Sequence, residues 1–133
     1  MKNGCKKILV VDDDELLLDA MSQMLLRMGY SVTVANDGEK GLSLFLRRQC
    51  DIVLTDFDMP GLDGISLAFR IKEMAPDTLV ILMTGHDRES IMGYIKHSAV
   101  DLALFKPFEL LTLEKVLQQS QTRREQKLRS SSY

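Results

Sequence analysis

The chain has 133 residues, which suits a single domain and leaves no room for a second catalytic domain. Its residues are 45% hydrophobic and 27% charged, with no apolar run long enough to span a membrane and no signal-peptide core near the N-terminus. We therefore expect a cytoplasmic protein without membrane contact. A net charge of −2 gives no basic surface that would favour direct nucleic-acid binding. Cys5 and Cys50 are not predicted to form a disulfide framework.

Apolar stretches alternate along the chain with segments of helical periodicity. The predicted strands are, in chain order, Ile8 to Val11, Ser31 to Ala35, Asp51 to Asp56, Leu79 to Met83 and Asp101 to Phe105. The predicted helices run from the acids after Val11 to Met28, from Asn36 or Asp37 to Arg48, from Ile65 to Met74, from about Arg88 to Ser98, and from about Pro107 onward. The core-facing positions predicted on the last four helices are Leu42, Phe45 and Leu46; Leu67, Ala68, Ile71 and Met74; Ile91, Met92 and Ile95; and Leu110, Leu111, Leu113, Val116 and Leu117.

Five strands that alternate with five helices predict an α/β domain with a parallel sheet, right-handed crossovers and helices on both faces. The run from Ser31 to Ala35 alternates in polarity, so we expect it near an edge of the sheet. In open sheets of this kind, ligands bind at the carboxyl ends of the strands.

Polar side chains stand at four of these predicted strand ends: Asp12 and Asp13, Asp56, Thr84, and Lys106. Three carboxylates on one rim would repel one another unless a cation lies between them, and an all-oxygen site of this kind suits Mg²⁺. A carboxylate can also attack phosphorus and form an acyl phosphate, provided that cations offset the developing charge. Lys106 and the metal would supply these cations, and the Thr84 hydroxyl could donate to a phosphoryl oxygen. The pattern points to covalent phosphorylation of Asp56.

Each of these residues also has a purely structural interpretation. The acids Asp12 to Asp14 could cap a helix, because acids favour its first turn. Taken alone, Thr84 could be a turn residue and Lys106 a solvated side chain. Only the joint pattern favours a site. His86 and His97 are assigned neither as metal ligands nor as phosphohistidines.

Five short motifs follow one another along the chain: Val11-Asp12-Asp13, Asp51-Ile52-Val53-Leu54-Thr55-Asp56, Met59-Pro60-Gly61-Leu62-Asp63-Gly64, Met83-Thr84-Gly85 and Phe105-Lys106-Pro107-Phe108. With this order and spacing, the chain resembles the receiver domain of two-component response regulators over about residues 5 to 120. The resemblance implies a flavodoxin-like, three-layer (βα)₅ fold whose five-stranded parallel sheet has the order 2-1-3-4-5.

The resemblance also implies a role for each site residue. Asp56 would be the phosphoacceptor, Lys106 would pair with Asp56 or its phosphate, and Thr84 would turn inward to bond the phosphoryl group. The peptide bond between Lys106 and Pro107 is expected to be cis. Mg²⁺, or Mn²⁺ as an alternative, would be held by the carboxylates of Asp12, Asp13 and Asp56 and by the backbone carbonyl of Asp58.

The implied function is a phosphorylation-activated switch in a two-component phosphorelay. A sensor histidine kinase or phosphotransfer protein would donate the phosphoryl group to Asp56. The receiver would then lose this phosphoryl group slowly by self-dephosphorylation. No other enzymatic activity is expected. We expect residues 1–119 to form the receiver domain and residues 120–133 a polar, basic tail or linker. The output domain or effector, and a dimer formed on phosphorylation, are left open.

Two other functions compete with this one. The motif Asp56-Phe57-Asp58 is similar to that of haloacid-dehalogenase phosphatases, although Pro60 and the short chain speak against them. A pseudo-receiver that binds a partner without phosphate is the other alternative. The intact acidic set, Thr84 and Lys106 oppose it, whereas Ala103 leaves it open. Ala103 stands where many receivers carry a Tyr or Phe that relays the threonine movement; Phe105, on the same side of the strand, could partly substitute for it.

Overall fold

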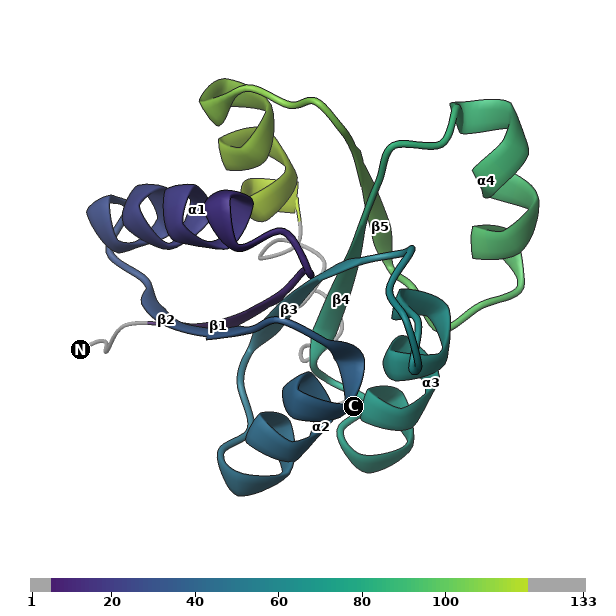
Figure 1. Cartoon of the computed structure of the whole chain (residues 1–133), viewed down its shortest axis with the longest axis horizontal. Coiled ribbons are helices and arrows are strands. Elements are labelled where there is room, and N and C mark those ends of the chain that lie inside the picture. The colour runs from purple at the N-terminus through teal and green to yellow at the C-terminus, as the bar shows by residue number, and fades with distance from the viewer. Residues whose placement is uncertain (1–5, 120–133) are drawn as a thin grey trace, which may run out of the picture.

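The computed structural model describes residues 6–119, which form a parallel sheet covered by helices on both faces (Figure 1). The elements are β1 (Lys7–Val11), α1 (Glu15–Arg27), β2 (Ser31–Ala35), α2 (Gly38–Arg47), β3 (Ile52–Asp56), α3 (Gly64–Met74), β4 (Leu79–Thr84), α4 (Arg88–Lys96) and β5 (Leu102–Phe105). A C-terminal helix follows at residues 110–119. Cys5 and the tail predicted at residues 120–133 lie outside the described residues.

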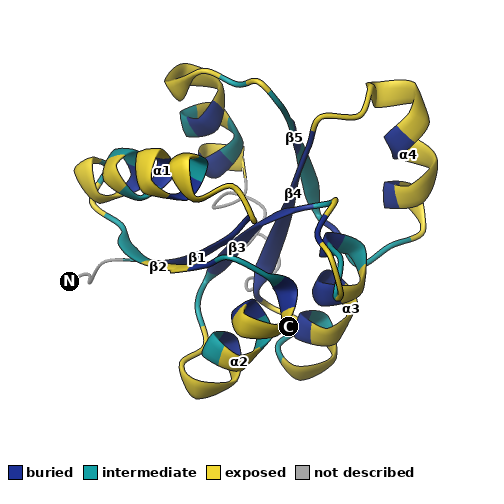
Figure 2. Cartoon of the chain, in the orientation of Figure 1, coloured by how far each residue is buried: buried dark blue, intermediate teal, exposed yellow. Residues whose placement is uncertain are grey.

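The strands lie in the order β2-β1-β3-β4-β5, and all neighbours are parallel. This confirms the predicted three-layer (βα)₅ architecture, with β2 at an edge. α1 and the C-terminal helix cover one face of the sheet, and α2, α3 and α4 cover the other (Figure 1). Every residue of β3 and β4 is buried (Figure 2) because helices cover both faces of these central strands, as expected for continuous apolar runs in a parallel sheet.

Aspartates begin four of the helices. They are Asp14, Asp37, Asp63 and Asp87, and each accepts hydrogen bonds from backbone N–H groups of the first helical turn. At the other end of α1, Gly29 adopts a φ of 97°, the left-handed conformation that commonly terminates a helix. The helix therefore ends beside Met28, where the sequence predicted its end.

Five apolar side chains predicted to face the core are instead exposed: Leu46, Met74, Met92, Leu110 and Leu111. These short helices bury only a narrow stripe, such as Leu113 and Leu117 on the C-terminal helix, which lie one turn apart. Leu110 and Leu111 belong to the first turn of that helix, ahead of the stripe. Cys50 is a free thiol. Among the described residues, no helix combines the length and the apolar character needed to cross a bilayer.

Candidate functional site

The strand register brings the predicted polar residues together at the carboxyl ends of the strands. Val11 is paired with Thr55, Asp56 with Met83, and Thr84 with Phe105, so the carboxyl ends of four neighbouring strands are level. The residues at or just beyond these ends are therefore neighbours, although they come from segments far apart in the sequence.

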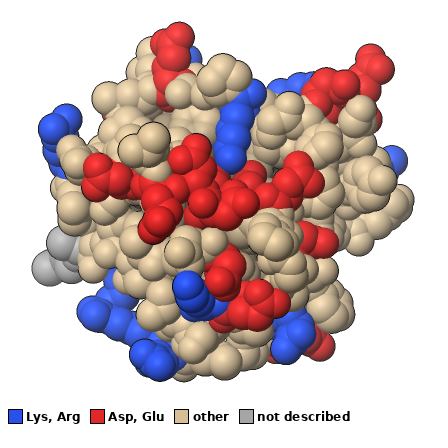
Figure 3. Space-filling view, in the orientation of Figure 1, with Lys and Arg blue, Asp and Glu red and all other residues tan. Residues whose placement is uncertain are grey.

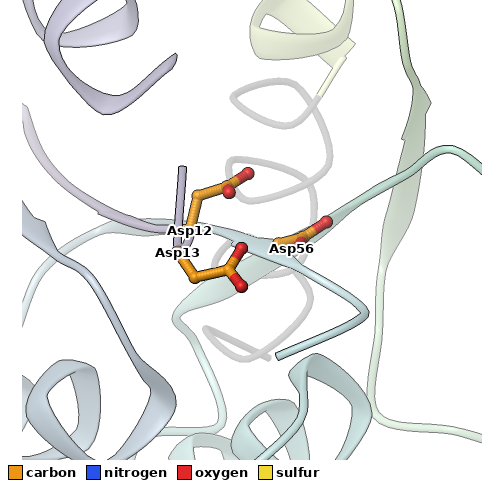
Figure 4. A group of neighbouring side chains, drawn as sticks. All are labelled: Asp12, Asp13 and Asp56. Atoms are coloured by element: carbon orange, nitrogen blue, oxygen red, sulfur yellow. The ribbon is translucent and has the colours of Figure 1, made fainter. Parts of the chain in front are cut away.

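Three carboxyl groups lie close together at the carboxyl ends of these strands (Figure 4). Asp12 and Asp56 are buried and Asp13 is exposed, and one oxygen from each lies within 4.8 Å of the others. Asp14, the next acid in the run, instead caps α1 by accepting from the backbone N–H groups of Leu16 and Leu17. Asp12 and Asp13 thus belong to the carboxylate cluster, whereas Asp14 serves as a helix cap.

Lys106 is the counter-charge of this cluster. Its Nζ donates to Asp12 Oδ2 at 2.7 Å and to Asp56 Oδ1 at 3.0 Å. The interpretation of Lys106 as a merely solvated side chain is therefore wrong. Three carboxylates against one ammonium leave an excess of two negative charges, which is the charge that a divalent cation would neutralise. The peptide bond from Lys106 to Pro107 is cis, as predicted.

The electrostatic environment shifts the pKa values of both partners upward. Burial raises the pKa of Asp56, and the nearby charge of Asp12 acts in the same direction, while the hydrogen bond from Lys106 opposes the shift. For Lys106, burial alone would lower the pKa, but the hydrogen bonds to Asp12 and Asp56 outweigh it and raise the pKa. The ammonium therefore remains charged beside the carboxylates at neutral pH.

Thr84 ends β4 with a side chain that is only 1% exposed. Its Oγ1 accepts a hydrogen bond from the backbone N–H of His86 at 3.0 Å. Within residues 6–119 the hydroxyl donates to no protein group, so its hydrogen is available to a group bound beside it.

One contact at the rim was not predicted from the sequence. His86 Nε2 lies 2.7 Å from Asp58 Oδ2, and both side chains are partly exposed. The Phe57 ring meets the His86 ring edge-on, with centroids 5.4 Å apart. Each partner lies two positions beyond a strand-end residue, Asp56 or Thr84, so the pairing of β3 with β4 could have indicated the contact.

Near Lys106, Ala103 and Phe105 both pack against the core cluster on the α2, α3 and α4 face, as their alternation in β5 predicted. The guanidinium carbon of Arg88 lies 4.7 Å above the centre of the Phe105 ring, a cation–π arrangement. This contact ties the start of α4 to β5.

A family model for the response regulator receiver domain matches residues 8–118. The chain belongs to this family. The predicted family resemblance is thereby confirmed, over nearly the whole described range of this receiver.

Relatives show the same similarity. The receiver is 36% identical over 115 residues to a two-component response regulator of Arabidopsis thaliana, a match that covers 84% of this chain and 30% of that protein. It is 31% identical over 117 residues to the autoinducer 1 sensor kinase/phosphatase LuxN of Vibrio harveyi, covering 88% of this chain and 14% of that protein. The chain thus spans less than a third of the length of these curated relatives.

Solved structures agree with the fold. A receiver domain protein from Methanospirillum hungatei superimposes with a TM-score of 0.87 at 25% identity, covering 93% of this chain and 99% of that one. A receiver domain from Clostridium thermocellum gives a TM-score of 0.82 at 30% identity, covering 90% of this chain and 97% of that one. The flavodoxin-like order predicted from the resemblance is therefore confirmed.

Proposed function

We propose that this receiver is a phosphorylation-controlled switch of a two-component phosphorelay, with Asp56 as the phosphoacceptor. The observation that carries the proposal is the placement of Asp56, whose Oδ1 lies 3.0 Å from Lys106 Nζ beside two further carboxylates at the end of a buried strand. Family membership supports the same assignment.

The proposed reaction is a transfer between two side chains. An oxygen of Asp56 attacks the phosphorus of a phosphohistidine on a kinase or phosphotransfer protein, forming an O–P bond as the N–P bond breaks. The leaving imidazole takes up a proton from solvent. Lys106 offsets charge on the phosphoryl oxygens, and the Thr84 hydroxyl donates to one of them. Later attack by water on the acyl phosphate returns the free carboxylate and inorganic phosphate.

The cluster of oxygens fits a divalent cation. Asp12, Asp13 and Asp56 offer three carboxylates within 4.8 Å of one another, and their excess negative charge favours a hard, doubly charged ion. We assign these three side chains and the backbone carbonyl of Asp58 as ligands of Mg²⁺, or of Mn²⁺. When bound, the ion would supply positive charge where the phosphoryl oxygens gather negative charge.

The proposal extends to the limits of the domain and to its partners. We assign residues 1–119 to the receiver, in keeping with the family match over residues 8–118. A histidine kinase or phosphotransfer protein would be the donor, and an output domain or effector would read the phosphorylated state. The phosphatase alternative has no support from the family match, and the intact set of Asp56, Thr84 and Lys106 opposes a pseudo-receiver.

The test is phosphorylation of the whole chain by acetyl phosphate with Mg²⁺. We expect intact-mass spectrometry to show one added phosphoryl group in the wild type and essentially none in Asp56→Asn, because the amide cannot form the acyl phosphate. Asp63→Asn is the matched control, since Asp63 lies in the loop that follows Asp56 but caps α3, and asparagine also caps helices. Full labelling of Asp56→Asn would show that another residue is the acceptor, and multiple turnover of phosphate esters would favour a phosphatase.

A further inference from the structure

A groove runs between α3 and α4, and none of its lining residues belongs to the carboxylate cluster. It has a volume of about 760 Å³ and is lined by Ile65, Phe69 and Arg70 of α3, by Tyr94 of α4, and by His97 and Ala99 just after α4. Phe69 is 59% exposed and Tyr94 65% exposed, so two aromatic rings border the groove in water. Exposed apolar surface of this kind is typical of interaction sites.

The residues that line the groove carry charge of one sign only. The chain has 19 acidic residues, yet none of the residues that line the groove is acidic. Arg70 is its cation, and within residues 6–119 this guanidinium takes part in no ion pair. The groove therefore offers apolar surface and an unpaired positive charge in one place.

A chain of aromatic contacts joins the groove to the proposed phosphorylation site. Phe57 follows Asp56 directly, and its ring centroid lies 6.1 Å from that of Tyr94. Phe57 and Ile65 also pack against the same core cluster. A displacement at Asp56 would thus reach the wall of the groove through one side chain. By contrast, Ala103 on β5 carries only a methyl group, which cannot act as a rotating relay.

We infer that the α3–α4 groove is the surface through which this receiver binds an acidic, amphipathic segment of another protein. An apolar side chain of that segment would lie between Phe69 and Tyr94, and a carboxylate beside it would pair with Arg70. The state of Asp56 would alter the groove through the contact between Phe57 and Tyr94. This last step rests on the proposed function, whereas the binding surface does not.

Charge decides against two other occupants. In a symmetric contact between two copies through this groove, each would present the same unpaired Arg70, and like charges oppose such pairing. The basic residues near the C-terminus, Arg123, Arg124, Lys127 and Arg129, also carry the wrong sign.

The binding surface is tested with two synthetic helical peptides of about 14 residues, roughly four turns. Both carry Leu and Phe on one face, and they differ only in having Glu or Lys beside that face. We expect fluorescence anisotropy to show about fivefold or greater preference for the Glu peptide in the wild type. Arg70→Gln should remove this preference, and Tyr94→Ala should weaken binding of the Glu peptide about tenfold.

Leu46→Ala is the matched control, because Leu46 is 61% exposed but lies on α2. It should leave both affinities unchanged, and the amide shifts that the Glu peptide causes in NMR spectra should fall on α3 and α4. Equal binding of the two peptides, or shifts confined to other elements, would overturn the proposal. Concentration-dependent dimerisation that Tyr94→Ala abolishes would assign the groove to a second copy instead.

The coupling is tested on the chain labelled by acetyl phosphate. Phosphorylation should change the affinity for the Glu peptide about threefold or more in the wild type and leave it unchanged in Phe57→Ala. An equal change in both proteins would refute the route through Phe57. If Asp56 is not labelled at all, the proposed function is wrong. Peptide binding by the unlabelled chain is a separate test, and its result decides the binding surface alone.

Discussion

At the scale of single residues, the rim combines groups that destabilise one another. Asp56 and Asp12 are buried next to each other, and Lys106 is shared between them. Groups of like charge held this close are typical of functional sites, where binding of a ligand relieves the repulsion. The raised pKa of Asp56 expresses this conflict, because burial and Asp12 disfavour its ionised form.

The raised pKa predicts that Asp56→Asn stabilises the receiver at neutral pH without divalent ions. The folded protein binds the Asp56 proton more tightly than the unfolded chain, so wild-type stability falls as the pH rises from the ordinary aspartate range, near 3.8, through the raised pKa. The variant lacks this loss. We expect a gain of about 1 kcal/mol, discounted for solvent at the rim and corresponding to roughly 4 °C in Tm.

Thermal unfolding followed by circular dichroism at several pH values would measure the gain. It should grow across the window above pH 3.8 and vanish below it. A gain of the same size at every pH would mean that packing, rather than ionisation, separates the two proteins.

At the scale of elements, the turn between β3 and α3 is fixed by close backbone contact. A Cβ atom on Gly64, the first residue of α3, would lie 2.1 Å from the backbone carbonyl oxygen of Asp56. The start of α3 thus rests directly on the residue that we propose as phosphoacceptor. Only glycine permits this approach.

We therefore predict that Gly64→Ala lowers the free energy of unfolding by about 2 kcal/mol or more, because backbone must shift to admit the methyl group. The same variant should slow labelling of Asp56 by acetyl phosphate. Gly93→Ala, inside α4, is the matched control: a Cβ there meets nothing within 4 Å, so it should stabilise the receiver by about 0.5–1 kcal/mol. Chemical denaturation of both variants decides the matter, and equal effects would contradict the prediction.

The strands and the site could be predicted from the sequence, whereas the buried faces of the helices and the contacts between elements could not. The five strands and the convergence of Asp12, Asp56 and Lys106 follow from apolar runs that end in polar residues. The edge position of β2 follows from the alternation of Ser31 to Ala35, whereas the full strand order followed only from the family resemblance. The exposed positions Leu46 and Leu111 do not follow, because a short helix buries only the stripe that its neighbours happen to cover. The bridge between His86 and Asp58, and the groove between α3 and α4, depend on strand register and helix spacing, which no local pattern specifies.

At the scale of the whole molecule, acidic side chains form a continuous band across the middle of the face seen in Figure 3. The carboxylate cluster adds an excess of negative charge, and the repulsion among these carboxylates destabilises the folded state. A cation bound there would stabilise the folded state alone, because the unfolded chain does not bring Asp12, Asp13 and Asp56 together.

We predict that Mg²⁺ raises the Tm of the receiver, with a stabilisation of about 2.7 kcal/mol at a concentration one hundred times the Kd. Asp13→Asn should weaken this response, and Asp12→Asn should largely remove it, since Asp12 is the buried member of the pair. Calorimetric scans with increasing Mg²⁺ provide the measurement, with Asp63→Asn as a control that should respond as the wild type does. If Mg²⁺ does not change the Tm of the wild type, the assignment of these residues as its ligands is wrong.

The bond between Lys106 and Asp12 joins residues 94 positions apart in the sequence. During synthesis β1 leaves the ribosome before β5, so Lys106 emerges after the other residues of the site. A nascent chain that still holds Lys106 inside the ribosome would have acids at its rim but no ammonium beside them. We therefore expect a nascent receiver that lacks Lys106 at the site to be unable to accept a phosphoryl group on Asp56.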